Sequence, residues 1–170
     1  ILVIAALDQQ GTVGVDGSPV RAEIGQPGAV ARFTFTGSTG QKIFVNVPTA
    51  TLPDECGVLA LEGPDRSKLA SGCIIGGNGF IDRTILPSPG QYTIVIDPSA
   101  RGTGDAQIRV IENHDQQGSP VVDGAGASAA MSQPGGVARF TFSGASVSKL
   151  SANVPPPPLT SECGGSPVQS

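Results

Sequence analysis

The sequence predicts an all-β protein. Its Val, Ile and Phe residues occur in short bursts separated by turns, and 24 of the 170 residues are Gly and 15 are Pro. Short apolar runs with turn residues between them are typical of strands. No stretch shows a sustained helical period of about 3.6 residues. A third observation, an internal repeat, assigns these strands to units of about 107 residues.

The repeat is visible as matching phrases at an offset of 107 residues. The phrases are DQQG (8–11 and 115–118), VDG (15–17 and 122–124), QPG followed by VARFTF (26–35 and 133–142), and NVP (46–48 and 153–155). When 8–63 is laid on 115–170, roughly 26 of 56 positions are identical. We therefore expect one complete repeat at 8–114 and the first half of the next repeat at 115–170, with DQQG as a short joint between them.

The apolar segment ILVIAAL at 1–7 aligns with IRVIENH at 108–114, so it corresponds to the closing strand of a preceding repeat. It lacks the basic region of a signal peptide and is too short to span a bilayer. An unpaired strand of this kind could add to the open sheet edge of a neighbouring copy. That possibility predicts head-to-tail assembly through Ile1, Leu2, Val3 and Ile4, while the alternative is that 1–170 is a window on a longer chain.

Eight strands are expected in the complete repeat, because each segment has one apolar face and ends in turn residues. The clearest is AVARFTFTG, in which Ala31, Phe33 and Phe35 share one face. It is interpreted as a hairpin with the next strand, although other pairings are open. The expected strands are 19–24, 29–37, 41–47, 57–63, 68–75, 80–86, 91–97 and 106–112.

The connections between these strands consist of turn-forming residues at 62–67, 76–79, 87–90 and 97–105. Sheets without covering helices must bury one face against another sheet. The pattern therefore predicts tandem Ig-like or jelly-roll β-sandwich repeats, and a single eight-stranded barrel would also fit.

Several of these strand-and-turn phrases resemble a known family. ARFTFTG, GQKIFV, LEGPDRSKLASG, ILPSPGQYTIVIDP and GTGDAQIRV look like the bacterial pre-peptidase C-terminal (PPC) type β-sandwich. The resemblance spans most of 15–112 and again 122–164. It implies a non-catalytic β-sandwich that occurs beside secreted peptidases and in tandem in very large extracellular bacterial proteins.

The cysteines predict a disulfide between Cys56 and Cys73, and two buried free thiols are the alternative. The bond would close a loop of about 17 residues and stabilise the fold by roughly 3 kcal/mol. Cys163 repeats Cys56 and is unpaired within this chain. A disulfide implies an oxidising compartment, so we expect a secreted or cell-surface (extracellular) location.

Charge and motifs argue against several classes of function. The net charge is -4 without a basic stripe, which argues against nucleic acid, and no apolar run reaches the ~18 residues of a membrane span. His114 is the sole histidine, and neither GxSxG nor HExxH is present, so we expect no enzyme.

Asp97 and Asp105 flank a Gly-rich loop and are weak Ca²⁺ candidates, although Asp is also a common turn residue. No other cofactor is indicated.

These observations predict a non-enzymatic structural repeat of an extracellular or cell-surface bacterial fibre, stalk or adhesin. Its partners would be neighbouring copies of itself or adjacent repeats. The alternative is an accessory binding module of a secreted hydrolase that holds glycan, peptide or Ca²⁺.

Overall fold

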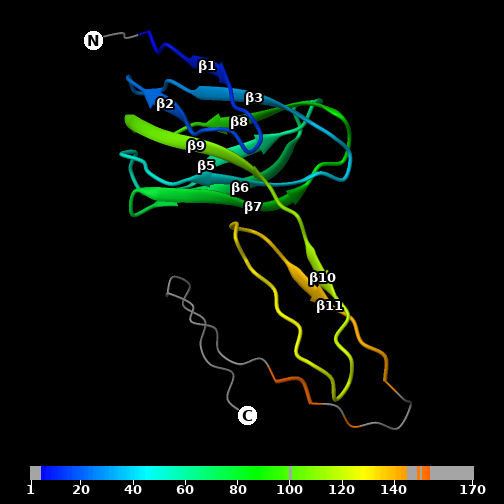
Figure 1. Ribbon diagram of the computed structural model, residues 1–170. Helices are drawn as coiled ribbons and strands as arrows, with labels where there is room; N and C mark the ends of the chain where they lie inside the picture. Colours follow the sequence, from blue (N-terminus) through cyan, green and yellow to red (C-terminus); the bar gives the residue numbers. More distant parts are fainter. Residues whose placement is uncertain (1–4, 100, 145–148, 150, 154–170) are drawn as a thin grey trace.

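The computed structural model describes residues 5–99, 101–144, 149 and 151–153, and every regular element in this part is a β-strand (Figure 1). Among these described residues there is no helix that could cross a membrane. Nine strands form one sheet, and two more form a small separate pair. The strands are β1 (Gln9–Thr12), β2 (Val20–Ile24), β3 (Ala31–Gly37), β4 (Lys42–Val47), β5 (Glu55–Glu62), β6 (Lys68–Ile75), β7 (Asn78–Ile85), β8 (Gly90–Ile96), β9 (Gly104–Glu112), β10 (Gln116–Gly118) and β11 (Ala138–Phe140).

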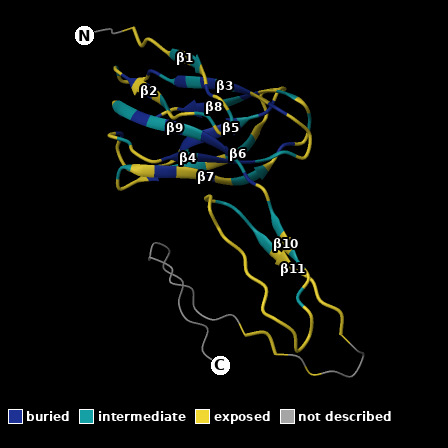
Figure 2. Ribbon diagram, viewed as in Figure 1, coloured by how far each residue is buried: buried dark blue, intermediate teal, exposed yellow. Residues whose placement is uncertain are grey.

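The nine-stranded sheet has the order β1-β3-β8-β5-β6-β7-β4-β9-β2. Its neighbours are antiparallel, except that β1 and β3 are parallel. The sheet curls until its edge strands, β1 and β2, come together, so that one face encloses a single core (Figures 1 and 2). The all-β prediction is confirmed, and the curled sheet is consistent with a β-sandwich that is nearly closed into a barrel.

All eight expected strands are present within a few residues of the predicted bounds, but the predicted hairpin between the second and third of them is wrong. β3 pairs with β1 and β8, whereas β4 pairs with β7 and β9. The turn after β3 bonds elsewhere: Gly40 N donates to Leu86 O at 2.8 Å, and Leu86 N donates to Gln41 O at 2.9 Å. These bonds direct β4 away from β3 and towards β7.

The core contains the residues that the alternation places on inner faces. Phe33 and Phe35 are 4% and 5% exposed, and Phe35 stacks on the fully buried ring of Tyr92 at a centroid distance of 5.6 Å. The Tyr92 hydroxyl donates to Ser88 O at 2.6 Å, so its one polar atom is satisfied. Burying a side chain of this size contributes about 1.5–3 kcal/mol.

Cys56 and Cys73 form a disulfide with an S–S distance of 2.03 Å, so this prediction is confirmed. The two cysteines are directly paired in the β5–β6 ladder. β6 then turns into β7 through Gly76 and Gly77, whose φ angles of 62° and 78° suit a two-residue type I′ hairpin. Cys163 and the predicted assembly residues Ile1, Leu2, Val3 and Ile4 lie outside the described residues.

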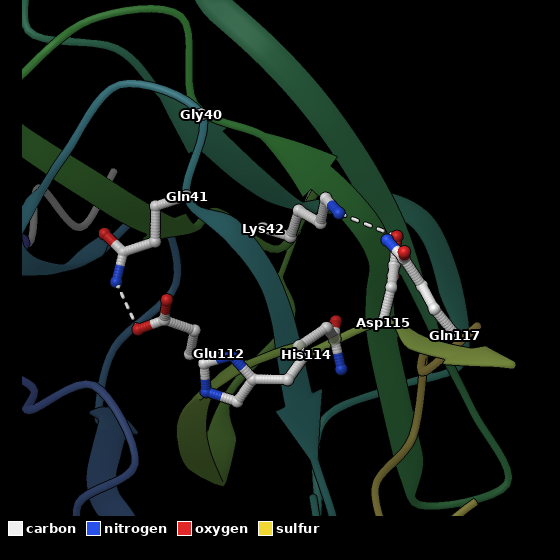
Figure 3. Close-up of a pocket in the computed structure, with 8 residues that line it drawn as sticks. Gly40, Gln41, Lys42, Glu112, His114, Asp115 and Gln117 are labelled. Atoms are coloured by element: carbon white, nitrogen blue, oxygen red, sulfur yellow. Dashed lines mark hydrogen bonds and ion pairs between the residues drawn. The ribbon is translucent and has the colours of Figure 1, made fainter. Parts of the chain in front are cut away.

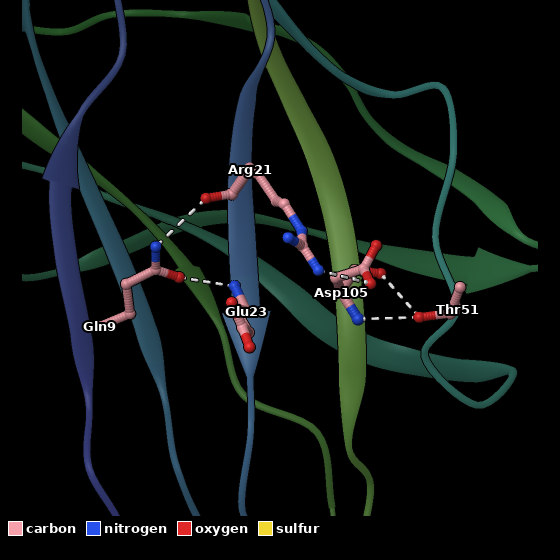
Figure 4. Close-up of polar contacts among 5 residues, drawn as sticks. All are labelled: Gln9, Arg21, Glu23, Thr51 and Asp105. Carbon is pink, nitrogen blue, oxygen red and sulfur yellow. Dashed lines mark hydrogen bonds and ion pairs between the residues drawn. The ribbon is translucent and has the colours of Figure 1, made fainter.

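The side chain of Gln9 joins the two edges of the curled sheet (Figure 4). Gln9 Nε2 donates to Arg21 O at 3.2 Å, and Gln9 Oε1 accepts from Glu23 N at 2.5 Å. The amide therefore bonds to β2 as the backbone of a neighbouring strand would. Gly11 follows on β1 without a side chain because a Cβ there would lie 2.8 Å from the ring of Phe33.

Replacing Gln9 with Met is expected to lower the free energy of unfolding by about 1–2 kcal/mol, because it removes two hydrogen bonds and leaves two backbone groups of β2 unpaired. Urea denaturation followed by circular dichroism measures the change. Gln10→Met is the matched control, since the Gln10 side chain is exposed and has no hydrogen bond in the described structure. Equal losses in the two variants would contradict this role.

The residues QQG of the DQQG phrase lie in a strand in both places where the phrase occurs, so within the expected joint only Asp115 connects the sheet to β10. β10 and β11 are parallel: Gln116 pairs with Ala138, and Gly118 pairs with Phe140. This is the register of β1 and β3 displaced by 107 residues. The side chain of Gln116 also bonds to both backbone groups of Ala130. The division of the chain into a complete and a partial repeat stays a prediction.

Candidate functional site at the junction between β9 and β10

Three residues, Asn113 to Asp115, connect the nine-stranded sheet to the β10–β11 pair, and we call this region the junction. Asn113 is 3% exposed although it is polar. Its backbone N donates to Lys42 O at 2.8 Å, and its Nδ2 donates to Pro134 O at 2.6 Å. One side chain therefore ties the last strand of the sheet to the loop that precedes β11.

Asp115 is held by two cations from the sheet. Its Oδ2 lies 2.7 Å from Lys42 Nζ at the start of β4, and its Oδ1 lies 2.8 Å from Arg83 Nη1 on β7. The Asp115 side chain is 9% exposed, so salt screens these ion pairs less than it would screen pairs on the open surface. The hydrogen bond from Lys42 lowers the pKa of Asp115; burial opposes this, and the charges of Lys42 and Arg83 lower the pKa further.

Phe44 forms the apolar part of the junction. It lies on the opposite face of β4 from the core residues Ile43 and Val45, yet it is only 6% exposed. Its ring stacks on Phe80 of β7 at a centroid distance of 5.7 Å. Gly135 covers it from the other side: a Cβ at this position would lie 2.8 Å from the Phe44 ring. The positive φ of Gly135, 76°, is a second reason for glycine there.

Two shallow hollows of about 270 and 230 Å³ open beside the junction, and both are lined by His114 and Asp115. Figure 3 shows the larger one. In the larger one, Gln41 Nε2 donates to Glu112 Oε2 at 2.7 Å. His114 is exposed, and in the described part of the chain it has no hydrogen bond to an acid or a nucleophile. The arrangement offers ion pairing and packing rather than a constellation for nucleophilic catalysis.

The structure does not bring the calcium candidates into a metal site. The carboxylate of Asp105 pairs with Arg21 at 3.2 Å, and its backbone N bonds to Thr51 Oγ1 at 2.9 Å (Figure 4). Asp97 is exposed on the surface. Within the described ranges, no group of three or more His, Cys, Asp or Glu residues is placed to hold a metal ion. Calcium binding by Asp97 and Asp105 thus stays a prediction.

Four junction residues were not predicted from the sequence: Lys42, Phe44, Arg83 and Asn113. One signal was present in KIFVNV, where Phe44 interrupts the alternation between apolar and polar positions. A bulky apolar side chain on the outer face of a strand favours a contact there, but a single one is ordinary on a protein surface, so the signal was weak. Arg83 and Asn113 carry no such signal, because single polar residues are ordinary near strand ends.

Comparisons with known proteins give structural likeness alone. No family model and no curated protein matches the chain. Among solved structures, the pre-peptidase C-terminal domain of collagenase from Bacillus anthracis is 14% identical, with a TM-score of 0.45 over 63% of this chain and 99% of that one. PliG from Aeromonas hydrophila, a periplasmic lysozyme inhibitor of g-type lysozyme, is 14% identical, with a TM-score of 0.39 over 61% and 99%.

PliG from Salmonella Typhimurium is 18% identical to this chain, with a TM-score of 0.34 over 59% of this chain and 99% of its own. At such identities and TM-scores, the likeness carries no inference about what this chain binds. The functional proposal therefore depends on the geometry of the junction.

Proposed function

We propose that this chain is a non-enzymatic structural repeat of an extracellular or cell-surface assembly, and that its junction holds successive β modules in a fixed orientation. The observation that carries the proposal is the contact of Asp115 with both Lys42 and Arg83. A flexible linker would leave such a carboxylate in water. Here the first residue of the following module is instead bound to two strands of the preceding one.

The packing around Asp115 supports the same function. Asn113 bonds to Pro134, and Phe44 packs against Gly135, so a polar and an apolar contact lie on either side of the same loop. Three contacts of different kinds restrain rotation about the linker better than any one of them. The Cys56–Cys73 disulfide supports a location outside the reducing cytosol.

Replacing Asp115 with Asn is expected to release β10 and β11 from the sheet. The variant keeps the shape of the side chain but loses the charge that pairs with Lys42 and Arg83. In ¹⁵N relaxation measurements on the whole chain, the amides of Gln116 and Ala138 should tumble with the sheet in the native protein. In the variant they should show faster local motion, while amides in β3 and β8 remain unchanged.

Asp97→Asn is the matched control, because it removes the same charge from an exposed carboxylate that has no ion pair in the described structure.

Lowering the pH and repeating the ¹⁵N relaxation measurement on the native chain supplies a second test. The pKa of Asp115 is depressed in the folded state, so its stabilising effect is present above the usual aspartate pKa of about 4 and is lost as the pH falls through the lower folded value. Independent tumbling of β10 and β11 in the native chain at neutral pH would contradict the proposal.

A binding assay distinguishes this proposal from an accessory module. Saturable binding in a glycan array or a Ca²⁺ titration, unaffected by Asp115→Asn, would favour a binding module of a secreted hydrolase. The structural proposal expects no such ligand.

A further inference from the structure

The surface around β1 contains counterparts of the residues that the β10–β11 segment uses at the junction. An offset of 107 places Ala6 at the position of Asn113 and Asp8 at the position of Asp115. The same offset places the loop Gln26–Pro27–Gly28 on Gln133–Pro134–Gly135. We call Ala6, Asp8 and residues 26–28 the upstream surface. It differs from the junction in lacking the two strands, β4 and β7, that would contact it.

The two QPG loops have the same conformation. Gly28 and Gly135 have φ angles of 81° and 76°. Each loop is closed by a hydrogen bond back to its glutamine: Ala29 N donates to Gln26 O at 3.1 Å, and Gly136 N donates to Gln133 O at 3.4 Å. The loop that packs on Phe44 in the junction is therefore already formed in the upstream surface.

The surroundings of the two loops differ on one side. A Cβ on Gly135 would lie 2.8 Å from the ring of Phe44 and 3.0 Å from Asn113 Oδ1. Among the described residues, a Cβ on Gly28 would meet only Ala6, at 4.0 Å. The counterpart of Asn113 is thus beside the upstream loop, whereas the place of the aromatic ring is open in the described structure.

The charges differ in the same way. Asp115 is bound by Lys42 and Arg83, whereas Asp8 is exposed and uses one carboxylate oxygen to accept a hydrogen bond from Val30 N at 3.0 Å. Asp8 has no ion pair within the described ranges. A surface that supplied two cations and an aromatic ring would therefore complement the upstream surface.

We infer that the upstream surface docks on the outer face of β4 and β7 of another copy of the nine-stranded unit. That face supplies Lys42 and Arg83 for Asp8, and Phe44 for Gly28. The inference rests on the proposed function and extends it, because each unit then has two complementary surfaces and an array can continue in one direction.

The partner is the Phe44-bearing unit and not the segment that contains β10 and β11. Position 151, which corresponds to Phe44, is Ser in that segment. A serine side chain is too short to cover the loop as the ring of Phe44 covers Gly135. The upstream surface therefore binds a unit that has Phe44 and not a segment that has Ser at the corresponding position.

The test uses the full chain with a second copy of residues 8–107 placed before Ile1, so that ILVIAAL takes the position of 108–114 in the added copy. The ring of Phe44 in the added copy should then lie over Gly28 of the original copy. We expect the Hα resonances of this Gly28 to move upfield relative to those of the 1–170 chain. A nuclear Overhauser effect should join them to the ring of Phe44 in the added copy.

Two matched variants separate the possible outcomes. Phe44→Leu in the added copy should return the Gly28 Hα resonances to their values in the 1–170 chain and leave Gly135 unchanged. Phe44→Leu in the original copy should shift Gly135 and leave Gly28 unchanged. The nuclear Overhauser effect is measured without any substitution, so it does not depend on the folding of a variant.

The further inference is overturned if Gly28 has the same Hα resonances with and without the added copy and shows no nuclear Overhauser effect to the Phe44 ring. A response of Gly135 in the same experiment would leave the proposed junction intact. If Gly135 also fails to respond to Phe44→Leu in the original copy, the proposed function falls as well.

Discussion

Replacing Gly72 with alanine is expected to lower the free energy of unfolding by about 3 kcal/mol. Gly72 lies in β6, and a Cβ at this position would overlap the carbonyl oxygen of Phe80 in β7. The overlap involves backbone, which cannot turn aside as a side chain can. The added Cβ would also lie 3.2 Å from Ile81 Cγ1, so the methyl group has no open space into which it could move.

Denaturation by urea measures this loss directly. Gly25→Ala is the control, because a Cβ at Gly25 meets nothing within 4 Å and the residue lies outside the strands. We expect that variant to stay within about 0.5 kcal/mol of the native protein. Similar small effects at both positions would show that β6 and β7 are not as close as described.

Removing the Cys56–Cys73 bond is expected to cost about 3 kcal/mol, since the cysteines are 17 residues apart and the bond restricts the unfolded chain. The double variant Cys56→Ala with Cys73→Ala should unfold at a lower urea concentration than the native protein. The bond also lies next to an irregularity, because the β5–β6 register shifts between Cys56 and Leu59.

Reduction provides the matching control for the disulfide. With Cys163 also replaced by alanine in both proteins, adding dithiothreitol to the protein that keeps Cys56 and Cys73 should reproduce the loss seen in the double variant, and adding it to the double variant should change nothing. The bond would not stabilise the fold if native and reduced protein unfolded at the same urea concentration. The junction should loosen together with the bond, because Cys73 pairs with Phe80, and Phe80 stacks on Phe44.

The strands and the core could be predicted well because they depend on local pattern. Ala31, Phe33 and Phe35 alternate with polar residues, and alternation places them on one face whatever the partner strand is. Turns were predictable for the same reason, since Gly76 and Gly77 allow the positive φ that a short hairpin needs. Pairing between strands was less accessible, and the expected β3–β4 hairpin was wrong.

The candidate site could be predicted only in part. The repeat drew attention to DQQG, but nothing in that phrase shows that Gln9 closes the sheet or that Asp115 meets Lys42 and Arg83. These contacts join residues far apart in the chain. Sequence pattern reports the period of a segment, and it carries little information about which other segment lies opposite.

The sequence by itself determined the all-β class and the inner faces of the strands, and it favoured the pairing of Cys56 with Cys73 that the structure then showed. Each of these follows from spacing and residue chemistry within short stretches. Only the tertiary structure decided the strand order and the junction, because both depend on which segments far apart in the chain pair with one another. β4 pairs with both β7 and β9, so Phe44 lies beneath Gly135 and Asp115 lies between two cations.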